Sequence, residues 1–221
     1  LTPHEMKLRL VLLKKTVDFS SVSALQQTVL YLGRLLVQSG VNALGVDAVA
    51  AFNAVSIIDS YVLAPGDSLA SSLMTFCAQN RGGKQYERIP AGFRRMMGMA
   101  TGCCAVIAVL VLALRRPLTG IFLKPEETLA LAEAMSYLVP MASFYFLSGI
   151  TNTFQGYFRG IGRLNMALAG TFVQIPVRVA VSYALFSLLG IQAAAVGTAL
   201  GWTCMAIFDA FMYRRQPVER S

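Results

Sequence analysis

Charged residues are scarce in this 221-residue chain: they make up 14% of it, where soluble domains carry roughly a quarter, and 56% is apolar. An ordinary water-soluble globule is therefore excluded. Histidine is nearly absent, with His4 the only one, which excludes multi-histidine metal sites and catalysis by Ser-His or Cys-His pairs in the apolar body. The sequence also lacks a Gly-x-Ser-x-Gly elbow, so an intramembrane serine protease or acyltransferase is a weak alternative and we expect no enzyme.

The four cysteines have no Cys-x-x-Cys spacing and lie in apolar stretches, so we interpret them as packing residues. The chain begins with Leu1 and has no small-residue cleavage site, which suggests a fragment without a signal peptide. Its net charge of +8 could indicate a nucleic-acid partner, but long stretches such as Met96–Leu114 carry no charge. We therefore expect the positive charge to lie in short loops and predict no nucleic-acid binding.

The apolar residues fall into stretches long enough to cross a membrane, for which a helix needs roughly 20 residues. There are six, at residues 20–41, 47–79, 94–114, 130–158, 164–189 and 191–213. Pro65 and Pro140 interrupt the two longest stretches, where we expect kinks. We predict an all-α integral membrane protein, in which residues 20–213 form a six-helix transmembrane bundle in a lipid bilayer and residues 214–221 form a cytoplasmic tail.

The distribution of Lys and Arg predicts the orientation of this bundle. Fourteen of them fall in residues 7–15, 81–95, 159–163 and 214–220, and three in residues 115–124 on the opposite side. Because short cytoplasmic loops hold the excess of positive charge, both termini are predicted to be cytoplasmic, in a multi-pass protein of the cell membrane. The even number of crossings independently requires both termini to lie on one side.

Three ionisable residues, Arg34, Asp59 and Arg178, fall inside predicted spans, where such groups are costly. Asp59 could form a structural ion pair with an arginine, and Arg178 is the better match in depth. It could instead be a cavity-lining carboxylate that meets cations or protons, or the span could be misplaced. Asp67 follows Pro65, where freed carbonyl groups favour either a watery niche or a solvated loop.

Uncharged polar groups are the other candidates for a pathway through the bundle. Amides inside spans either bond between helices, which we favour, or line an aqueous path. They are Gln26, Gln27, Asn53, Asn152, Gln155 and Gln174. Tyr61 and the run Phe144–Phe146 offer aromatic rings to a lipophilic cation or contact lipid. Asp209, Tyr213 and Glu133 lie near predicted boundaries and need no functional explanation.

Six motifs stand in order along the chain: Ser23–Gln27, Ala50–Asn53 through Ile58–Ser60, Ala64–Asp67, Thr75–Gly82, Tyr157–Gly162 and Gln174–Arg178. Together they resemble the carboxy-terminal lobe of multidrug and toxic compound extrusion (MATE) transporters. The resemblance implies a twelve-helix secondary antiporter with two six-helix lobes that expels small organic cations in exchange for H⁺ or Na⁺ and uses no other cofactor. Residues 1–19 then resemble the cytoplasmic linker between lobes, and the partner would be an amino-terminal lobe or a second copy.

The chain departs from this family at acidic positions. Some members have a sodium site made by an acid in the first helix of this lobe and another in the fourth, but residues 19–46 contain no Asp or Glu and Ser148 takes the fourth-helix position. Asp59 is the acid that remains, and it resembles an aspartate of the bacterial branch. Two further alternatives stay open. One is a flippase lobe for lipid-linked oligosaccharides, for which only Arg34 and Arg178 could hold pyrophosphate, and the other is an inactive membrane fragment.

Overall fold

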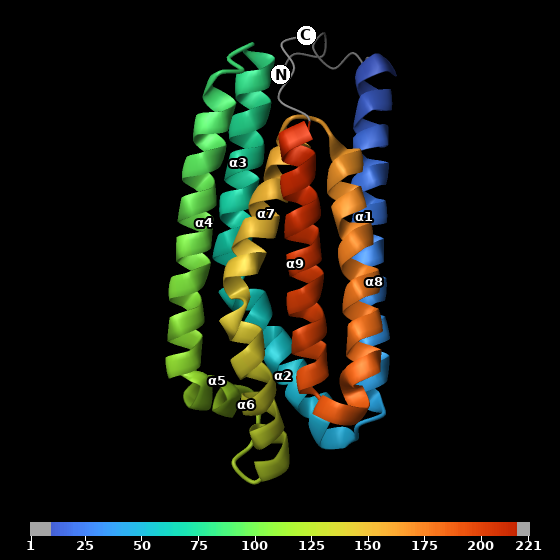
Figure 1. Ribbon diagram of the computed structural model, residues 1–221, viewed down its shortest axis with the longest axis vertical. Coiled ribbons are helices and arrows are strands. Elements are labelled where there is room, and N and C mark those ends of the chain that lie inside the picture. The colour runs from blue at the N-terminus through green and yellow to red at the C-terminus, as the bar shows by residue number, and fades with distance from the viewer. Residues whose placement is uncertain (1–9, 216–221) are drawn as a thin grey trace, which may run out of the picture.

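The computed structural model describes residues 10–215, without the side chains of residues 11, 12 and 15, and this part of the chain is helical with no strand (Figure 1). Its helices are α1 (Leu10–Asn42), α2 (Val46–Val62), α3 (Ala64–Gly82), α4 (Arg88–Ala113), α5 (Arg115–Phe122), α6 (Thr128–Ser143), α7 (Tyr145–Gly160), α8 (Leu164–Leu189) and α9 (Gln192–Arg215). The all-α prediction is confirmed. α1 begins at Leu10, so the second half of the segment 1–19 is helical.

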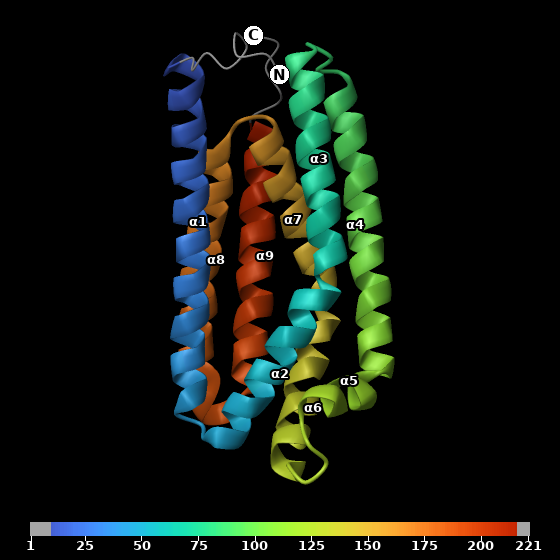
Figure 2. The ribbon, with the colours of Figure 1, turned by 180° about the vertical axis from the view of Figure 1, so that it is seen from behind.

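The long rods of the bundle are α1, α4, α8, α9 and two bent pairs of helices (Figures 1 and 2). α2 and α3 meet at 41°, and α6 and α7 at 51°. The first bend falls just before Pro65, which takes an early position in α3 where its missing N–H would have no partner in any case. Pro140 lies inside α6, four residues before the second bend at Phe144. Both of the longest stretches are therefore bent, the first at Pro65 as expected and the second at Phe144 instead of at Pro140.

Two glycines in the left-handed backbone region end helices and reverse the chain. Gly162 has φ 74° between α7 and α8, and Gly190 has φ 53° between α8 and α9. A residue with a side chain is strained at such angles, so glycine permits these short connections. Arg81, near the end of α3, donates a hydrogen bond to the carbonyl of Ile161 and ties α3 to the first of these turns. The motifs Thr75–Gly82 and Tyr157–Gly162 thus meet at one end of the bundle.

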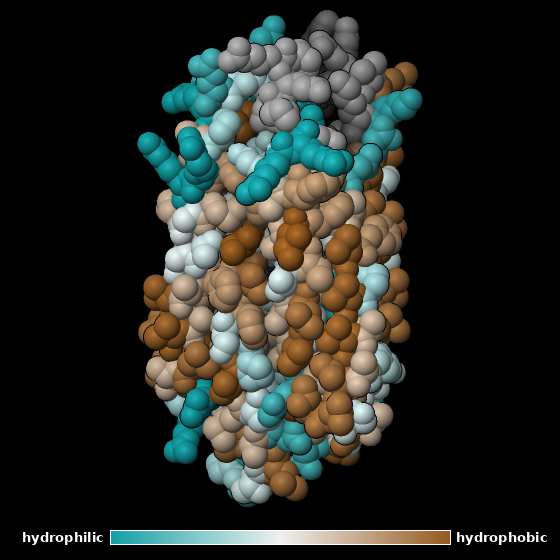
Figure 3. Space-filling model, in the orientation of Figure 1, coloured by the Kyte–Doolittle hydropathy of each residue, from teal (hydrophilic) through white to brown (hydrophobic). Residues whose placement is uncertain are grey.

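The outer surface carries apolar side chains around the middle of the bundle. Val106 is 61% exposed and Val109 66% exposed on α4. Figure 3 shows apolar residues over the middle of this face and hydrophilic ones gathered toward the two ends. Apolar residues that point outward along whole helices need lipid around them, so this is a membrane protein.

Length and apolarity qualify three described helices as spans: α4, α8 and α9. Each bent pair adds one more when it is counted as a single span, which makes five. α1 does not meet that composition test, although it runs for 33 residues and packs along α8 in the same bundle (Figure 2). The sixth rod is therefore identified by its packing.

Close helix contacts at α7 depend on glycine. A methyl group on Gly156 would meet the backbone of Ala70 on α3, and one on Gly149 would lie 2.8 Å from the carbonyl oxygen of Ala100 on α4. Gly98 and Gly102 on α4 have nothing within 4 Å of that position. Glycine therefore permits close helix contacts on α7, whereas Gly98 and Gly102 on α4 make no such contact. These contacts hold α7 against α3 and α4, where it forms one wall of the cavity described below.

Candidate functional site

A cavity of about 570 Å³ has α1 and α3 among its walls, which stand on either side of α9 in Figure 2. Five helices supply nearly all of its lining. The residues are Gln26, Gln27, Leu30 and Arg34 of α1; Asp67, Ala70, Ser71 and Met74 of α3; Ser148, Thr151, Asn152, Gln155, Gly156 and Arg159 of α7; Thr171, Gln174 and Arg178 of α8; Trp202 and Met205 of α9; and Leu63. Helical spacing of three or four residues puts each set on one face of its helix.

The cavity brings together eight of the eleven ionisable, amide and tyrosine candidates that the sequence singled out. They are Gln26, Gln27, Arg34, Asp67, Asn152, Gln155, Gln174 and Arg178. Three others lie outside its lining: Asn53 and Tyr61 are exposed on α2, and Asp59 lies on the same helix. Tyr61 is 74% exposed and does not contact the rings of Phe144 and Phe146, whose centroids are 6.5 Å apart. The structure therefore does not bring these rings together around a cation.

Asp59 is held by a neighbouring tyrosine. The hydroxyl of Tyr145, which is 0% exposed on α7, donates a hydrogen bond to Asp59 Oδ1. Arg178 and Arg34 lie close enough for their charges to act on this carboxyl group, but among the described residues neither forms an ion pair with it. Of the alternatives for Asp59, the ion pair with Arg178 is not formed, and the carboxyl group bonds to Tyr145.

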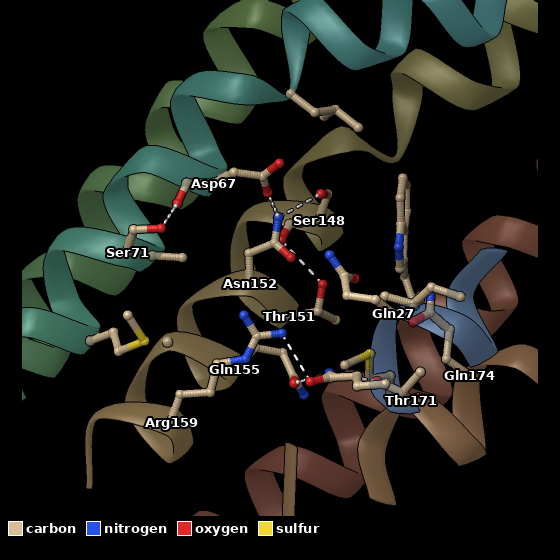
Figure 4. A pocket seen from close by; sticks show the side chains of 18 of the residues that line it. Gln27, Asp67, Ser71, Ser148, Thr151, Asn152, Gln155, Arg159, Thr171 and Gln174 are labelled. Atoms are coloured by element: carbon tan, nitrogen blue, oxygen red, sulfur yellow. Dashed lines mark hydrogen bonds between the residues drawn. The ribbon is translucent and has the colours of Figure 1, made fainter. Parts of the chain in front are cut away.

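Asp67 is the acidic residue of the cavity wall. Asn152 Nδ2 donates to Asp67 Oδ1 at 2.6 Å and also approaches Ser148 Oγ at 3.3 Å (Figure 4). The Asp67 side chain is exposed in the described bundle. Of the two expectations for this residue, the structure favours the watery niche, because the helix continues through it and the carboxylate faces an open cavity.

A second polar group surrounds Gln26, which is 3% exposed. Its Nε2 atom donates to Thr171 Oγ1 at 2.8 Å and to Gln155 Oε1 at 2.9 Å, and its Oε1 atom accepts from Arg159 Nη2 at 2.9 Å. Gln155 Nε2 in turn donates to Asp209 Oδ2 at 3.2 Å. For Gln26 and Gln155, the expected bonding between helices is confirmed. Figure 4 shows Gln155 and Arg159 side by side on α7.

Sequence reasoning missed two members of these groups. Arg159 was counted among the charges of the short cytoplasmic loops and Asp209 was placed near a predicted boundary, whereas Arg159 lines the cavity and Asp209 is 0% exposed. The polar positions 148, 151, 152, 155 and 159 share one face of α7, and this spacing was a signal that could have found Arg159. For Asp209 the sequence holds no such signal.

The chemistry of this cavity suits binding. Its lining joins charged and amide groups with the apolar side chains of Leu30, Trp202 and Met205, a combination that fits amphipathic molecules. Three arginines and one aspartate supply the charge of this wall. The described residues contain no group of three or more His, Cys, Asp or Glu side chains that could hold a metal ion.

Comparison with known proteins gives consistent results. The family model described as MatE matches residues 23–184. The probable multidrug resistance protein YoeA of Bacillus subtilis (strain 168) is 29% identical over 104 residues, which are 47% of this chain and 22% of that protein. A crystal structure of MATE in complex with MaL6 has a TM-score of 0.89 at 16% identity, with 97% of this chain and 49% of that chain covered. A MOP superfamily transporter from Pyrococcus furiosus likewise has a TM-score of 0.89 at 16% identity, with 97% of this chain and 49% of that chain covered. This chain thus spans about half the length of the solved structures that it matches.

Proposed function

Because this chain belongs to the MatE family, we propose that it forms one of the two lobes of an exporter that works by alternating access. Members of this family are transporters and not enzymes. The solved structures that it matches are about twice as long as this chain, which covers 49% of the MATE structure with MaL6. A second six-helix lobe, or a second copy of this chain, would complete the transporter.

The observation that carries this proposal is the open polar cavity between α1 and α3. Most of the outer surface around the middle of the bundle is apolar, whereas this one face presents arginine, aspartate and amide groups. Polar groups at membrane depth are stable when they face water or a partner. A second lobe set against α1 and α3 would enclose the cavity, and rocking of the two lobes would open it to each side of the membrane in turn.

We propose that small organic cations are exported through this cavity in exchange for H⁺ or Na⁺. Asp67 supports this role, because its side chain is exposed in the cavity and Asn152 donates to one of its two oxygens. Leu30 and Trp202 offer apolar surface for the rest of such a molecule. Both termini are proposed to face the cytoplasm, since the ends of α3, α7 and α9 and the start of α1 share the end of the bundle that carries most of the positive charge (Figure 1).

The test is efflux of a lipophilic cationic dye from proteoliposomes that hold this chain with a matching six-helix lobe. We expect efflux driven by an imposed H⁺ or Na⁺ gradient with both lobes, and none from the chain alone as a monomer. Asp67→Asn should weaken dye binding about 10-fold or more, as expected for the loss of a charged partner. Asp47→Asn, at the exposed start of α2, is the matched control and should leave binding unchanged. Efflux by a proven monomer would contradict the two-lobe proposal, and dye binding unchanged in Asp67→Asn would contradict the role of Asp67.

A lipid-linked anionic substrate is the second candidate, and Arg159 favours it. The sequence suggested two arginines in the cavity, whereas its wall carries three, Arg34, Arg159 and Arg178. Among the described residues, none of the three forms an ion pair with a carboxylate, and the buried Nε atoms of Arg159 and Arg178 have no hydrogen-bond partner. Binding of a lipid pyrophosphate that is lost in Arg34→Gln/Arg159→Gln/Arg178→Gln would support this candidate, and binding that is unchanged in this triple variant would exclude it.

A further inference from the structure

A buried carboxyl group lies at the end of a row of hydrogen bonds that starts in the cavity. Asp209 of α9 is 0% exposed and lies between Gln155 of α7 and Gly170 of α8. Its Oδ2 atom accepts from Gln155, and its Oδ1 atom is buried with no hydrogen-bond partner among the residues that the structure describes. A methyl group on Gly170 would lie 2.6 Å from Oδ1, so glycine makes room for this oxygen.

The bonds of this row all point in one direction. Arg159 donates to Gln26, Gln26 donates to Gln155, and Gln155 donates to Asp209. Two amides therefore connect a guanidinium group on the cavity wall with a carboxyl group outside the cavity lining. Hydrogen bonds in such a row polarise one another, so a change of charge at one end acts on the other end.

No cation neutralises Asp209 directly within the described part of the chain. Arg159, on α7, is two amides away. Arg178, on α8, stands eight residues beyond Gly170, which is ~12 Å along a helix. α6 packs against the opposite end of α9, where Ala194 of α9 and Tyr137 of α6 belong to one apolar core. Tyr137 and Glu133, which also lies on α6, are therefore far from Asp209.

Two further titratable side chains near this end of α9 are tyrosines in an aromatic cluster. Tyr157 of α7 and Tyr213 of α9 have ring centroids 5.1 Å apart, and both rings also pack on Phe93 of α4. Arginines also lie at this end: Arg214 and Arg215 end α9, and Arg94 and Arg163 act on the two tyrosines. None of these arginines acts on Asp209, whose surroundings are set by burial and by Gln155. A buried carboxylate without a nearby cation costs several kcal/mol, and the uptake of a proton removes that cost.

We propose that Asp209 binds a proton, and that its charge sets the direction of the amide row and thereby the place of Arg159 in the cavity. The carboxylate accepts from Gln155, as observed. When the carboxylate takes a proton from a hydronium ion and leaves a water molecule, it gains an O–H donor. Turning the Gln155 amide by half a turn puts its oxygen toward that donor and its NH₂ group toward Gln26. Only the link between this proton and the movement of substrate rests on the proposed transport function. The binding of the proton and the movement of Arg159 do not depend on it.

The reversal continues to the cavity. Gln26 then presents its oxygen to Gln155, and the hydroxyl of Thr171 can turn to donate to the same oxygen. Its NH₂ group faces Arg159, and because two donors cannot bond, the guanidinium group leaves Gln26. Asp67, the carboxylate on the neighbouring helix α3, attracts the freed Arg159. A proton at a site outside the cavity thus moves a positive charge within it.

The test is infrared difference spectroscopy of the full chain in lipid nanodiscs between acidic and alkaline buffer. Two signals are followed: the C=O stretch of a protonated carboxyl group and the C–N stretch of the Arg159 guanidinium group, which is assigned with Arg159→Lys. We expect the two signals to change with one common pH midpoint. In Asp209→Asn, the guanidinium signal should no longer change with pH, and the carboxyl signal should lose the contribution of Asp209. Asp209→Glu should restore both changes.

Gln155→Leu separates proton binding from coupling. This variant should keep the carboxyl signal change of Asp209 and lose the guanidinium signal change. Cys204→Ser, which lies on α9 like Asp209, should leave both changes intact. A guanidinium change that persists in Asp209→Asn or in Gln155→Leu would overturn the proposal, as would a carboxyl change that is the same with and without Asp209. Circular dichroism checks that each variant stays helical. Since no substrate or gradient is present, failure of transport does not affect this result.

Discussion

A methyl group added at Gly156 should loosen the bundle, whereas one added at Gly102 should not. At Gly156 the new carbon would meet the carbonyl oxygen of Ala70 and lie 3.0 Å from its carbonyl carbon, so α7 must move away from α3. At Gly102, on the exposed face of α4, nothing lies within 4 Å. Alanine stabilises a helix interior over glycine by ~0.5–1 kcal/mol, and overpacking costs ~1–3 kcal/mol. The free energy of unfolding of Gly156→Ala should therefore lie ~1–3 kcal/mol below that of Gly102→Ala.

The assay is equilibrium unfolding in mixed micelles with increasing dodecyl sulfate, followed by the fluorescence of Trp202, the single tryptophan of the chain. Gly102→Ala should unfold at the same or a higher denaturant fraction than the unmodified chain. Gly156→Ala should unfold earlier. If Gly156→Ala unfolds at the same point as Gly102→Ala, or later, the close approach of α7 to α3 is refuted.

Three further outcomes are expected. Tyr145→Phe leaves Asp59 without its hydrogen-bond donor and should lower the unfolding free energy by ~1–3 kcal/mol, an effect that should shrink when Asp59→Asn is added. Phe93→Ala removes a ring that packs on three other aromatic rings and should cost ~3–5 kcal/mol in the same unfolding assay. A membrane-permeant thiol reagent should modify Cys103 well before Cys77, which is 0% exposed. Mass spectrometry of peptides measures this order, and modification of Cys77 first would contradict the burial of its side chain.

The bundle could be predicted from the sequence because its causes are local. The length of each apolar stretch, the prolines at 65 and 140 and the loop charges act within one segment, so the rods and both bends follow from short windows. The length of α1 did not follow. Its first ten described residues mix charged and apolar side chains, so their composition does not predict a continuous helix, although α1 runs through them and packs along α8.

The site depends on how each helix is rotated about its axis, which the sequence does not determine. Gln26 and Gln27 are neighbours of one residue type, yet Gln26 is buried and hydrogen-bonded to two other helices and Gln27 is exposed in the cavity. Arg178 was the better match in depth for an ion pair with Asp59, but the carboxyl group of Asp59 bonds to Tyr145 at the start of α7. Depth along a helix can be counted from the sequence, but direction requires the packed bundle.

The central claim is that the face between α1 and α3 is the wall of a water-filled transport cavity within the membrane. Its most direct test replaces the four native cysteines by alanine and introduces one cysteine at a time, Ser71→Cys on the cavity wall and Val106→Cys on the outer face of α4. In lipid vesicles, a water-soluble maleimide should label the cysteine at position 71 rapidly and the one at position 106 hardly at all. Equal labelling, or faster labelling at position 106, would contradict this account.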